Sequence, residues 1–274
     1  MKFAICNEIF QDFPLEQQFA VASRLGFDAI EVSPFTIEQY VTDISEDQRK
    51  LVVDLGKEHG LEIAGIHWVL VGPEGLHLTS PDDETRERSK QYMRDLTQFG
   101  CDIGGRVMIV GSPMQRNILP GVEPAQAKQW FGEAMAEAAK ADPKGEFTIC
   151  IEPLSPEITN LLTCAAEARE IADAVNLPNV GIILDVNAMS AGEDNIPEAI
   201  RATKDHLRHF HVNDPNQRGP GWGDVDFRPI LATLLEVGYE GYVSMEAFEF
   251  ELDPVEHAQK SIAYLRETLA EVSG

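Results

Sequence analysis

Paired cysteines and long apolar runs are both missing from this sequence, and each absence excludes a class of protein. The four cysteines (Cys6, Cys101, Cys150 and Cys164) form no CxxC pair, so we expect reduced thiols and a cytoplasmic protein instead of a disulfide framework. Cys6 and Cys150 lie inside apolar runs, where cysteine usually acts as a small buried hydrophobe. No apolar stretch approaches the ~20 residues that cross a bilayer, and the N-terminus lacks a signal peptide's apolar core. We therefore expect no membrane partner.

Positive charge is also scarce. The 274 residues include 22 Lys and Arg against 46 Asp and Glu, for a formal net charge of −24. This balance repels phosphate backbones and anionic lipid surfaces, so it argues against nucleic acid as a partner. It does not exclude a small anionic ligand held by a local arginine. The remaining composition, 43% hydrophobic and 25% charged, is that of an ordinary globular protein.

Short apolar runs rich in isoleucine and valine recur at even spacing and predict eight strands. The predicted strands are 2–6, 27–32, 62–67, 106–110, 147–152, 180–185, 207–212 and 241–246. Amphipathic stretches with helical spacing lie between them, most clearly at 15–26, 47–60, 125–142, 164–176 and 258–272.

This alternation of strands and helices predicts a (β/α)8 barrel. The alternative, a doubly wound open sheet, would need a glycine-rich phosphate turn after an early strand, and CNEIFQDF after the first strand contains none. No linker or charge run divides the chain, so we predict one domain over residues 1–274. The long segment 68–84 is predicted to be an active-site loop.

Four of the late predicted strands end on residues that bind hard metal ions: Glu152, Asp185, His211 and Glu246. The carboxyl ends of the strands build the active site of such a barrel. Three carboxylates and one imidazole that converge there would repel one another strongly unless a cation neutralised them. Oxygen-rich ligation with a single nitrogen suits Mn²⁺, Mg²⁺ or Co²⁺. We expect one divalent ion, with Mn²⁺ as the first choice and Mg²⁺, Co²⁺ and Zn²⁺ as alternatives.

The motifs IEPL, LD, HVND and ME, in this order and at barrel-strand spacing, resemble the xylose-isomerase-like TIM-barrel superfamily. That superfamily includes sugar-phosphate isomerases and epimerases, the D-tagatose and D-psicose 3-epimerase type, inosose dehydratases, hydroxypyruvate isomerases and endonuclease IV. The resemblance covers nearly the whole chain. It implies that the four residues bind one divalent metal and that Glu152 and Glu246 form an acid/base pair. The implied activity is isomerisation or epimerisation of a small carbohydrate, a ketose or related keto-polyol, through a metal-stabilised cis-enediolate.

Two positions depart from the ketose 3-epimerase pattern. Ala188 stands where a histidine usually follows the metal-binding aspartate by three residues, and Ile158 stands where a glutamate usually supports the EPL motif. Both changes suggest a different substrate contact, for which Asn187 is a candidate. A metal-dependent dehydratase or lyase of a keto-polyol, similar to inosose dehydratase, is the main alternative, followed by a non-catalytic sugar-binding barrel. The histidine missing at Ala188 and the net charge disfavour a DNA-repair enzyme similar to endonuclease IV.

Further substrate contacts are predicted at the strand ends and in the loop after the seventh strand. The candidates are Glu8, His67, Trp68, Asn187, Arg218 and Trp222. Three of them have a simpler alternative: Glu8 as a helix cap, His67 in a structural hydrogen bond and Arg218 as a solvated loop cation.

Four neighbouring residues are expected to act structurally. His209 is predicted to lie one layer below His211, Asn213 and Asp214 to orient His211 or the loop backbone, and Asp226 to cap the next helix. A homodimer or homotetramer is compatible with the sequence, which does not reveal exposed apolar patches.

Overall fold

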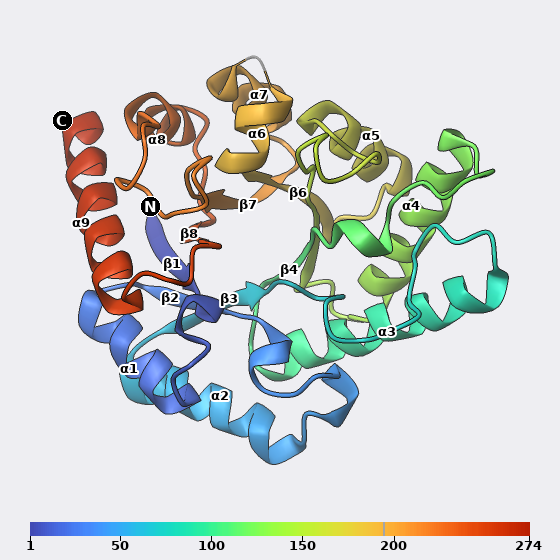
Figure 1. Ribbon diagram of the computed structural model, residues 1–274, viewed down its shortest axis with the longest axis horizontal. Helices are drawn as coiled ribbons and strands as arrows, with labels where there is room; N and C mark the ends of the chain where they lie inside the picture. Colours follow the sequence, from blue (N-terminus) through green and yellow to red (C-terminus); the bar gives the residue numbers. More distant parts are fainter. Residues whose placement is uncertain (194) are drawn as a thin grey trace.

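Eight parallel strands close into a barrel in which every strand pairs with its sequence neighbours and β1 pairs with β8. This computed structural model describes residues 1–193 and 195–274. Figure 1 shows the strands surrounded by helices. The strands are β1 (Lys2–Cys6), β2 (Ala29–Val32), β3 (Glu62–Ile66), β4 (Val107–Val110), β5 (Thr148–Ile151), β6 (Val180–Asp185), β7 (Leu207–Val212) and β8 (Tyr242–Met245). Each lies within one predicted range, so the predicted (β/α)8 barrel is confirmed.

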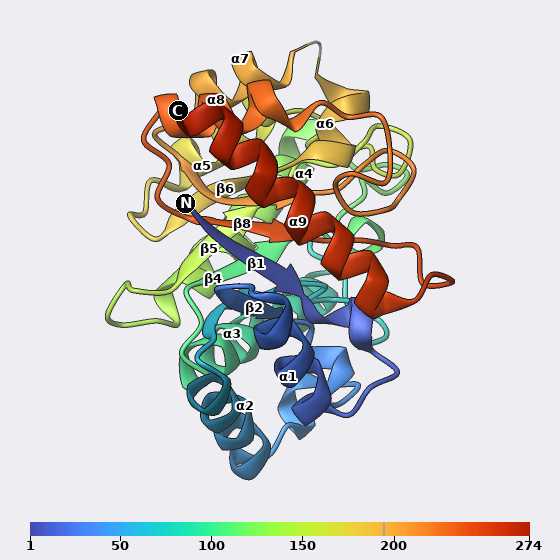
Figure 2. The ribbon, with the colours of Figure 1, turned by 90° about the vertical axis from the view of Figure 1, so that its left-hand side faces the viewer.

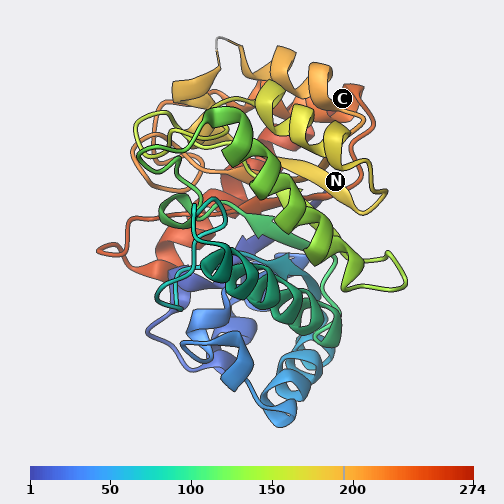
Figure 3. The same ribbon diagram turned by 90° about the vertical axis from the view of Figure 1, so that its right-hand side faces the viewer.

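Helices on the outside of the barrel connect the strands. The α-helices are α1 (Leu15–Leu25), α2 (Glu46–His59), α3 (Asp83–Asp102), α4 (Pro124–Lys140), α5 (Ala165–Val175), α6 (Val186–Gly192), α7 (Ile196–Thr203), α8 (Phe227–Glu236) and α9 (Pro254–Ser273). Helix α9 packs against both α1 and α8 (Figure 2). On another side of the barrel, α4 packs between α3 and α5 (Figure 3). In the described part of the chain, no helix has the length and hydropathy of a membrane span.

Local signals set the helix ends. Helix α2 begins at a capping box, in which the Ser45 side chain accepts from the Gln48 backbone and the Gln48 side chain accepts from the Ser45 backbone. It ends at Gly60, whose φ of 66° is the left-handed conformation that glycine adopts without penalty. Helix α9 begins four residues earlier than predicted, because the Asp253 side chain accepts from the Glu256 backbone and caps the helix there.

Two kinds of core support the strands. The main apolar core lies between the strands and the helices. Two smaller apolar clusters come from alternate strand residues, which face the inside of the barrel. One contains Ala4, Ala29, Ala64 and Tyr242, and the other contains Val107, Ile109, Cys150 and Ile183. Towards the carboxyl ends of the strands the inward-facing residues become polar, and the candidate site begins there.

Candidate active site

Four polar side chains from four consecutive strands meet at the carboxyl end of the barrel. Glu152 and Glu246 directly follow β5 and β8, Asp185 ends β6, and His211 lies near the end of β7. Each offers one ligand atom, and these atoms all lie within 4.8 Å of one another. His211 Nδ1 is 3.0 Å from Glu246 Oε2 and 3.8 Å from Glu152 Oε1. The structure thus brings together the four residues that the sequence singled out.

Crowding and burial perturb the acidity of these carboxyl groups. Burial, and then the charge of Glu246, raise the pKa of Glu152 to about 8. The same two causes raise the pKa of Asp185 to about 6. Burial also acts to raise the pKa of Glu246, but the charge and hydrogen bond of His211 outweigh it and leave that pKa below its ordinary value. At neutral pH a proton on Glu152 therefore offsets negative charge at a place where a bound cation would do so directly.

Neighbouring side chains hold two of the four in place. Asn213 Nδ2 donates to Asp185 Oδ2 at 2.6 Å, and its Oδ1 accepts from the Asn187 backbone at 2.8 Å. His211 Nε2 lies 3.1 Å from Glu31 Oε1, and His209 Nε2 lies 2.7 Å from Glu31 Oε2. Asn213 thus orients Asp185. The sequence predicted that Asn213 would orient His211 or the loop backbone instead. His209 lies one layer below His211, in a structural hydrogen bond.

Two buried charged residues that contact the site were not predicted from the sequence. Glu31 is fully buried on β2, and its signal was a carboxylate inside an otherwise apolar strand. Arg116 is also fully buried, just after the 3-10 helix η4 (Pro113–Gln115), and its Nη1 donates to the Glu152 carbonyl oxygen at 2.5 Å. Burial lowers the pKa of this guanidinium to about 10. No sequence signal distinguished Arg116 from a surface loop cation.

A cavity of about 630 Å³ opens above the four residues. Glu152, Asp185 and Glu246 line it, and apolar parts of its wall come from Leu154, Ile158 and Phe248, among other residues. The volume is within the ordinary range for small-molecule sites. Trp68 and Val71, at the start of the long loop after β3, also contribute to the wall.

Three of the predicted substrate contacts line this cavity, namely His67, Trp68 and Asn187. Trp68 Nε1 donates to Glu246 Oε1 at 3.1 Å, and Trp68 adopts the unusual left-handed φ of 53°. Glu8 is not part of the cavity wall. It is fully buried, and its Oε2 lies 2.6 Å from His67 Nε2. It also does not cap α1, whose N-cap is Pro14.

The structure does not bring Arg218 and Trp222 to the cavity, contrary to the prediction. Arg218 Nη2 lies 3.9 Å from Glu249 Oε2, with both side chains partly exposed. Trp222 Nε1 donates to the His257 carbonyl oxygen on α9 at 3.2 Å. The loop after β7 is anchored outward on α9, and Gln217, with a φ of 67°, lines the cavity instead.

Two structural expectations for this loop agree with the hydrogen bonds observed. Asp226 caps α8 by accepting from the Arg228 backbone at 3.0 Å. Asp214 accepts from the Val225 backbone at 3.3 Å. It thereby orients the loop backbone, which was one of its two predicted roles, and does not orient His211.

Comparison with known proteins shows the family to which the chain belongs. The family model described as xylose isomerase-like TIM barrel matches residues 19–268. A probable ketose 3-epimerase of a Synechocystis species is 28% identical over 86% of this chain and 79% of its own length. The D-psicose 3-epimerase of Ruminiclostridium cellulolyticum is 28% identical over 82% of this chain and 75% of its own length. The 3-dehydro-D-guloside 4-epimerase of Escherichia coli is 23% identical over 97% and 99%, respectively.

Solved structures show the same fold. A crystal structure of D-psicose 3-epimerase in the presence of D-fructose superposes with a TM-score of 0.85, at 22% identity, and covers 98% of this chain and 99% of its own. A structure of L-ribulose 3-epimerase gives a TM-score of 0.86 at 21% identity, covering 99% and 95%. The curated relatives named above are sugar epimerases, and they confirm the predicted enzyme class, isomerase. The chain belongs to the xylose isomerase-like TIM barrel family.

Proposed function

We propose that this protein is a divalent-metal-dependent epimerase or isomerase that acts on a ketose or a related keto-polyol. The observation that carries the proposal is the convergence of Glu152, Asp185, His211 and Glu246 below a cavity of sugar-binding size. The names of the relatives, which are ketose and keto-sugar epimerases, support the same reaction class. Residues 1–274 are proposed to act as one domain, and a homo-oligomeric state and a cytoplasmic location stay predictions.

The donor set fits a hard divalent cation. Three carboxylates supply oxygen and one imidazole supplies nitrogen, without sulfur, a combination that suits Mn²⁺ first and Mg²⁺, Co²⁺ or Zn²⁺ as alternatives. The raised pKa values of Glu152 and Asp185 support this fit, because burial and then the neighbouring charge of Glu246 make their ionised forms unfavourable, and a bound cation would stabilise those forms. When bound, the ion would polarise the substrate carbonyl and acidify the neighbouring C–H bond.

Two side chains of the site can move protons. We assign Glu152 and Glu246 as the acid/base pair, because each combines a place in the cavity wall with a position directly after a strand. One carboxylate would remove a proton from a substrate carbon to give a cis-enediolate, and the other would return a proton. Return to the opposite face of the same carbon epimerises the sugar, whereas return to the adjacent carbon isomerises it. Trp68 Nε1 holds Glu246 for this role.

The cavity chemistry favours an unphosphorylated substrate. Among its lining residues in the described part of the chain there is no lysine or arginine, whereas Glu152, Glu157, Asp185 and Glu246 contribute carboxylates. Away from the proposed metal, a phosphate group would therefore meet carboxylates without a lysine or arginine as partner. His67, Asn187 and Gln217 offer hydrogen bonds that suit sugar hydroxyl groups.

Deuterium incorporation tests the proposal directly. The purified protein is incubated in D₂O with Mn²⁺, Mg²⁺ or Co²⁺ and a panel of ketoses and keto-inositols, and C–H exchange is followed by NMR. We expect Glu152→Gln and Glu246→Gln to keep the fold and to slow exchange by about 10²–10⁴-fold, the usual contribution of a general acid or base. Glu249→Gln, a carboxylate outside the cavity, is the matched control.

The readouts separate this proposal from its alternatives. Exchange at the parental rate in both glutamine variants would overturn it. Proton abstraction followed by loss of a β-hydroxyl group, detected as an enol or diketone by ultraviolet absorbance, would instead identify a keto-polyol dehydratase. Tight binding of a ketose without any turnover would indicate a sugar-binding barrel.

A further inference from the structure

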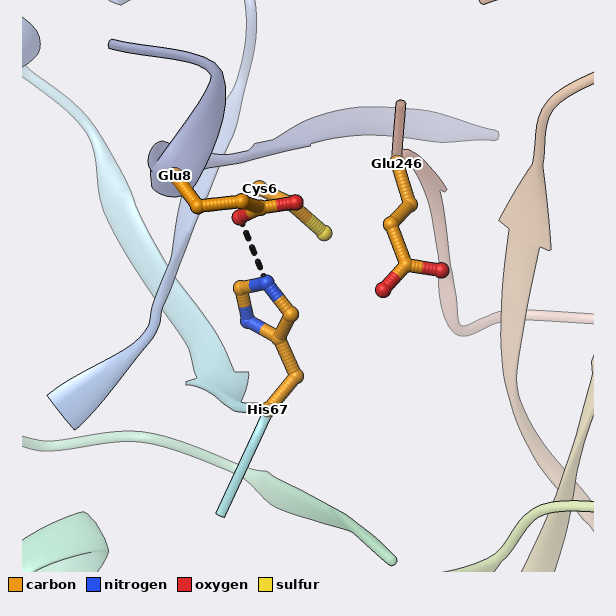
Figure 4. A group of neighbouring side chains, drawn as sticks. All are labelled: Cys6, Glu8, His67 and Glu246. Carbon is orange, nitrogen blue, oxygen red and sulfur yellow. Dashed lines mark hydrogen bonds and ion pairs between the residues drawn. The ribbon is translucent and has the colours of Figure 1, made fainter. Parts of the chain in front are cut away.

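A second group of potential metal ligands lies beside the four residues already described and shares Glu246 with them. Its other members are Cys6 at the end of β1, Glu8 in the 3-10 helix η1 (Asn7–Phe10) and His67 directly after β3. One ligand atom from each of the four lies within 4.8 Å of the others, and all four residues are buried. Figure 4 shows the side chains of Cys6 and Glu8 next to each other, with His67 and Glu246 facing them.

Glu8 provides an independent sign that a ligand belongs here. Its Oε2 is paired with His67 Nε2 at 2.6 Å, but its Oε1 has no hydrogen-bond partner among the described residues although it is fully buried. Leaving a buried carboxylate oxygen unpaired is costly, and such atoms are rare in folded proteins. The Glu8–His67 hydrogen bond therefore satisfies only one of the two carboxylate oxygens of Glu8. A bound cation would satisfy the other oxygen.

The neighbouring carboxylate, Glu31, offers no such vacancy. It forms another potential ligand group with Cys6 and His211. However, its two oxygens already pair with His209 at 2.7 Å and with His211 at 3.1 Å. A cation bound to Glu31 would compete with these contacts, whereas a cation beside Glu8 meets a carboxylate oxygen that has no hydrogen-bond partner among the described residues.

The ligand chemistry of the second group differs from that of the first. Cys6 contributes sulfur, His67 nitrogen, and Glu8 and Glu246 oxygen. A thiolate combined with an imidazole and carboxylates suits Zn²⁺ or Co²⁺, whereas Mg²⁺ and Mn²⁺ prefer oxygen. On binding, the metal replaces the Cys6 thiol proton, which is released to solvent, so no oxidant or reductant is needed.

We infer that the protein has a second metal site, in which Cys6, Glu8 and His67 bind a borderline cation such as Zn²⁺ and Glu246 lies between this ion and the first. The site goes beyond the proposed function, which needs only one ion. The two ions share the Glu246 carboxylate, so the active site is dinuclear when both are bound.

Cobalt binding provides a test that does not depend on catalysis. Metal-free protein is titrated with Co²⁺, and the bound metal is counted while the near-ultraviolet region is scanned for a sulfur-to-cobalt charge-transfer band. We expect two Co²⁺ per chain and a thiolate band, because only the second site contains sulfur. Cys6→Ser should remove the band and reduce the count to one, whereas Cys164→Ser, a partly buried cysteine outside both groups, should change neither.

Two further variants keep the test decisive. If Cys6→Ser fails to fold, Glu8→Gln, which retains the sulfur but weakens the carboxylate ligand, should lower the affinity of the band-forming ion at least tenfold. Asp185→Asn should remove the ion without sulfur and leave the band, so failure of the first site is distinguishable from failure of the second. A parental protein that binds one Co²⁺ without a thiolate band, or a band that survives in Cys6→Ser, would overturn the inference.

Discussion

A single carboxylate on β2, Glu31, holds two histidines of β7 at once. Burial acts to raise the pKa of Glu31, but the charges and hydrogen bonds of His209 and His211 outweigh it and hold that pKa well below its ordinary value. Because His211 Nε2 faces Glu31, its Nδ1 faces Glu246 and Glu152. A carboxylate behind a histidine in this way fixes the ring orientation and raises the basicity of the opposite nitrogen.

Replacing Glu31 by glutamine should therefore weaken metal binding without removing a ligand. His209 and His211 contact different oxygens of Glu31. Glutamine replaces one of these oxygens by an NH₂ group, which cannot accept a hydrogen bond, so one imidazole loses its acceptor. We expect Mn²⁺ affinity to fall by about 10–100-fold, measured by isothermal titration calorimetry. Glu62→Gln, a partly exposed carboxylate at the start of β3, is the control. Parental affinity in Glu31→Gln, with an unchanged circular dichroism spectrum, would contradict this role.

Some residues of the site could be identified from the sequence, and others could not. Each of the four convergent residues could be found because it stands where the apolar alternation of a strand stops, and barrel geometry then places all four at one end. Glu31 shows what the sequence leaves out. Its partners His209 and His211 lie 178 and 180 positions away along the chain, across the barrel interior. Such a contact depends on the strand register across the closed barrel, which local patterns do not encode.

The position of the loop between β7 and α8 also depends on long-range contacts that local sequence patterns do not encode. Glycine and proline, which are typical of bends, are frequent in this loop, but they do not indicate the direction in which the loop carries Arg218 and Trp222. That direction is set by α9, where His257 Nε2 accepts from the Gly219 backbone at 2.8 Å and Trp222 packs edge-on against the His257 ring. Lys260, one turn further along α9, lies 4.0 Å from the centre of the Trp222 ring.

This attachment of the loop to α9 should depend on pH. Burial, and then the charge of Arg218, lower the pKa of His257 to about 4. In the unfolded chain the pKa of a histidine is about 6.5, so between that pH and the lower pKa of folded His257 the unfolded state binds a proton that the folded state does not bind. His257 thus reduces stability progressively as the pH falls from about 6.5 to about 4, by at most ~1.4 kcal/mol per pH unit.

Urea unfolding at several pH values measures this dependence. His257→Gln keeps an acceptor for the Gly219 N–H but cannot titrate, so its free energy of unfolding should fall less steeply between pH 6.5 and 4 than that of the parent. Equal slopes for the two proteins would show that His257 does not carry the effect.

Over the whole molecule, the four convergent residues connect β5, β6, β7 and β8, which are consecutive around the barrel. An ion that binds them should therefore stabilise the folded chain. At a Mn²⁺ concentration 100 times its dissociation constant, we expect about 2.7 kcal/mol of added stability and a higher Tm, both reversed by EDTA. Asp185→Asn should abolish most of this shift. A parental Tm that does not respond to Mn²⁺ or to EDTA would argue against a metal site in the barrel.

The position of Glu246 has a consequence for the order of events during biosynthesis. Glu246 belongs to both candidate ligand groups and directly follows β8, the last strand to be synthesised. Until β8 has joined β1, with Lys2 opposite Tyr242, neither group is complete. A chain in which β8 has not yet joined the barrel therefore offers only partial coordination spheres. We expect tight metal binding to follow closure of the barrel and not to precede it.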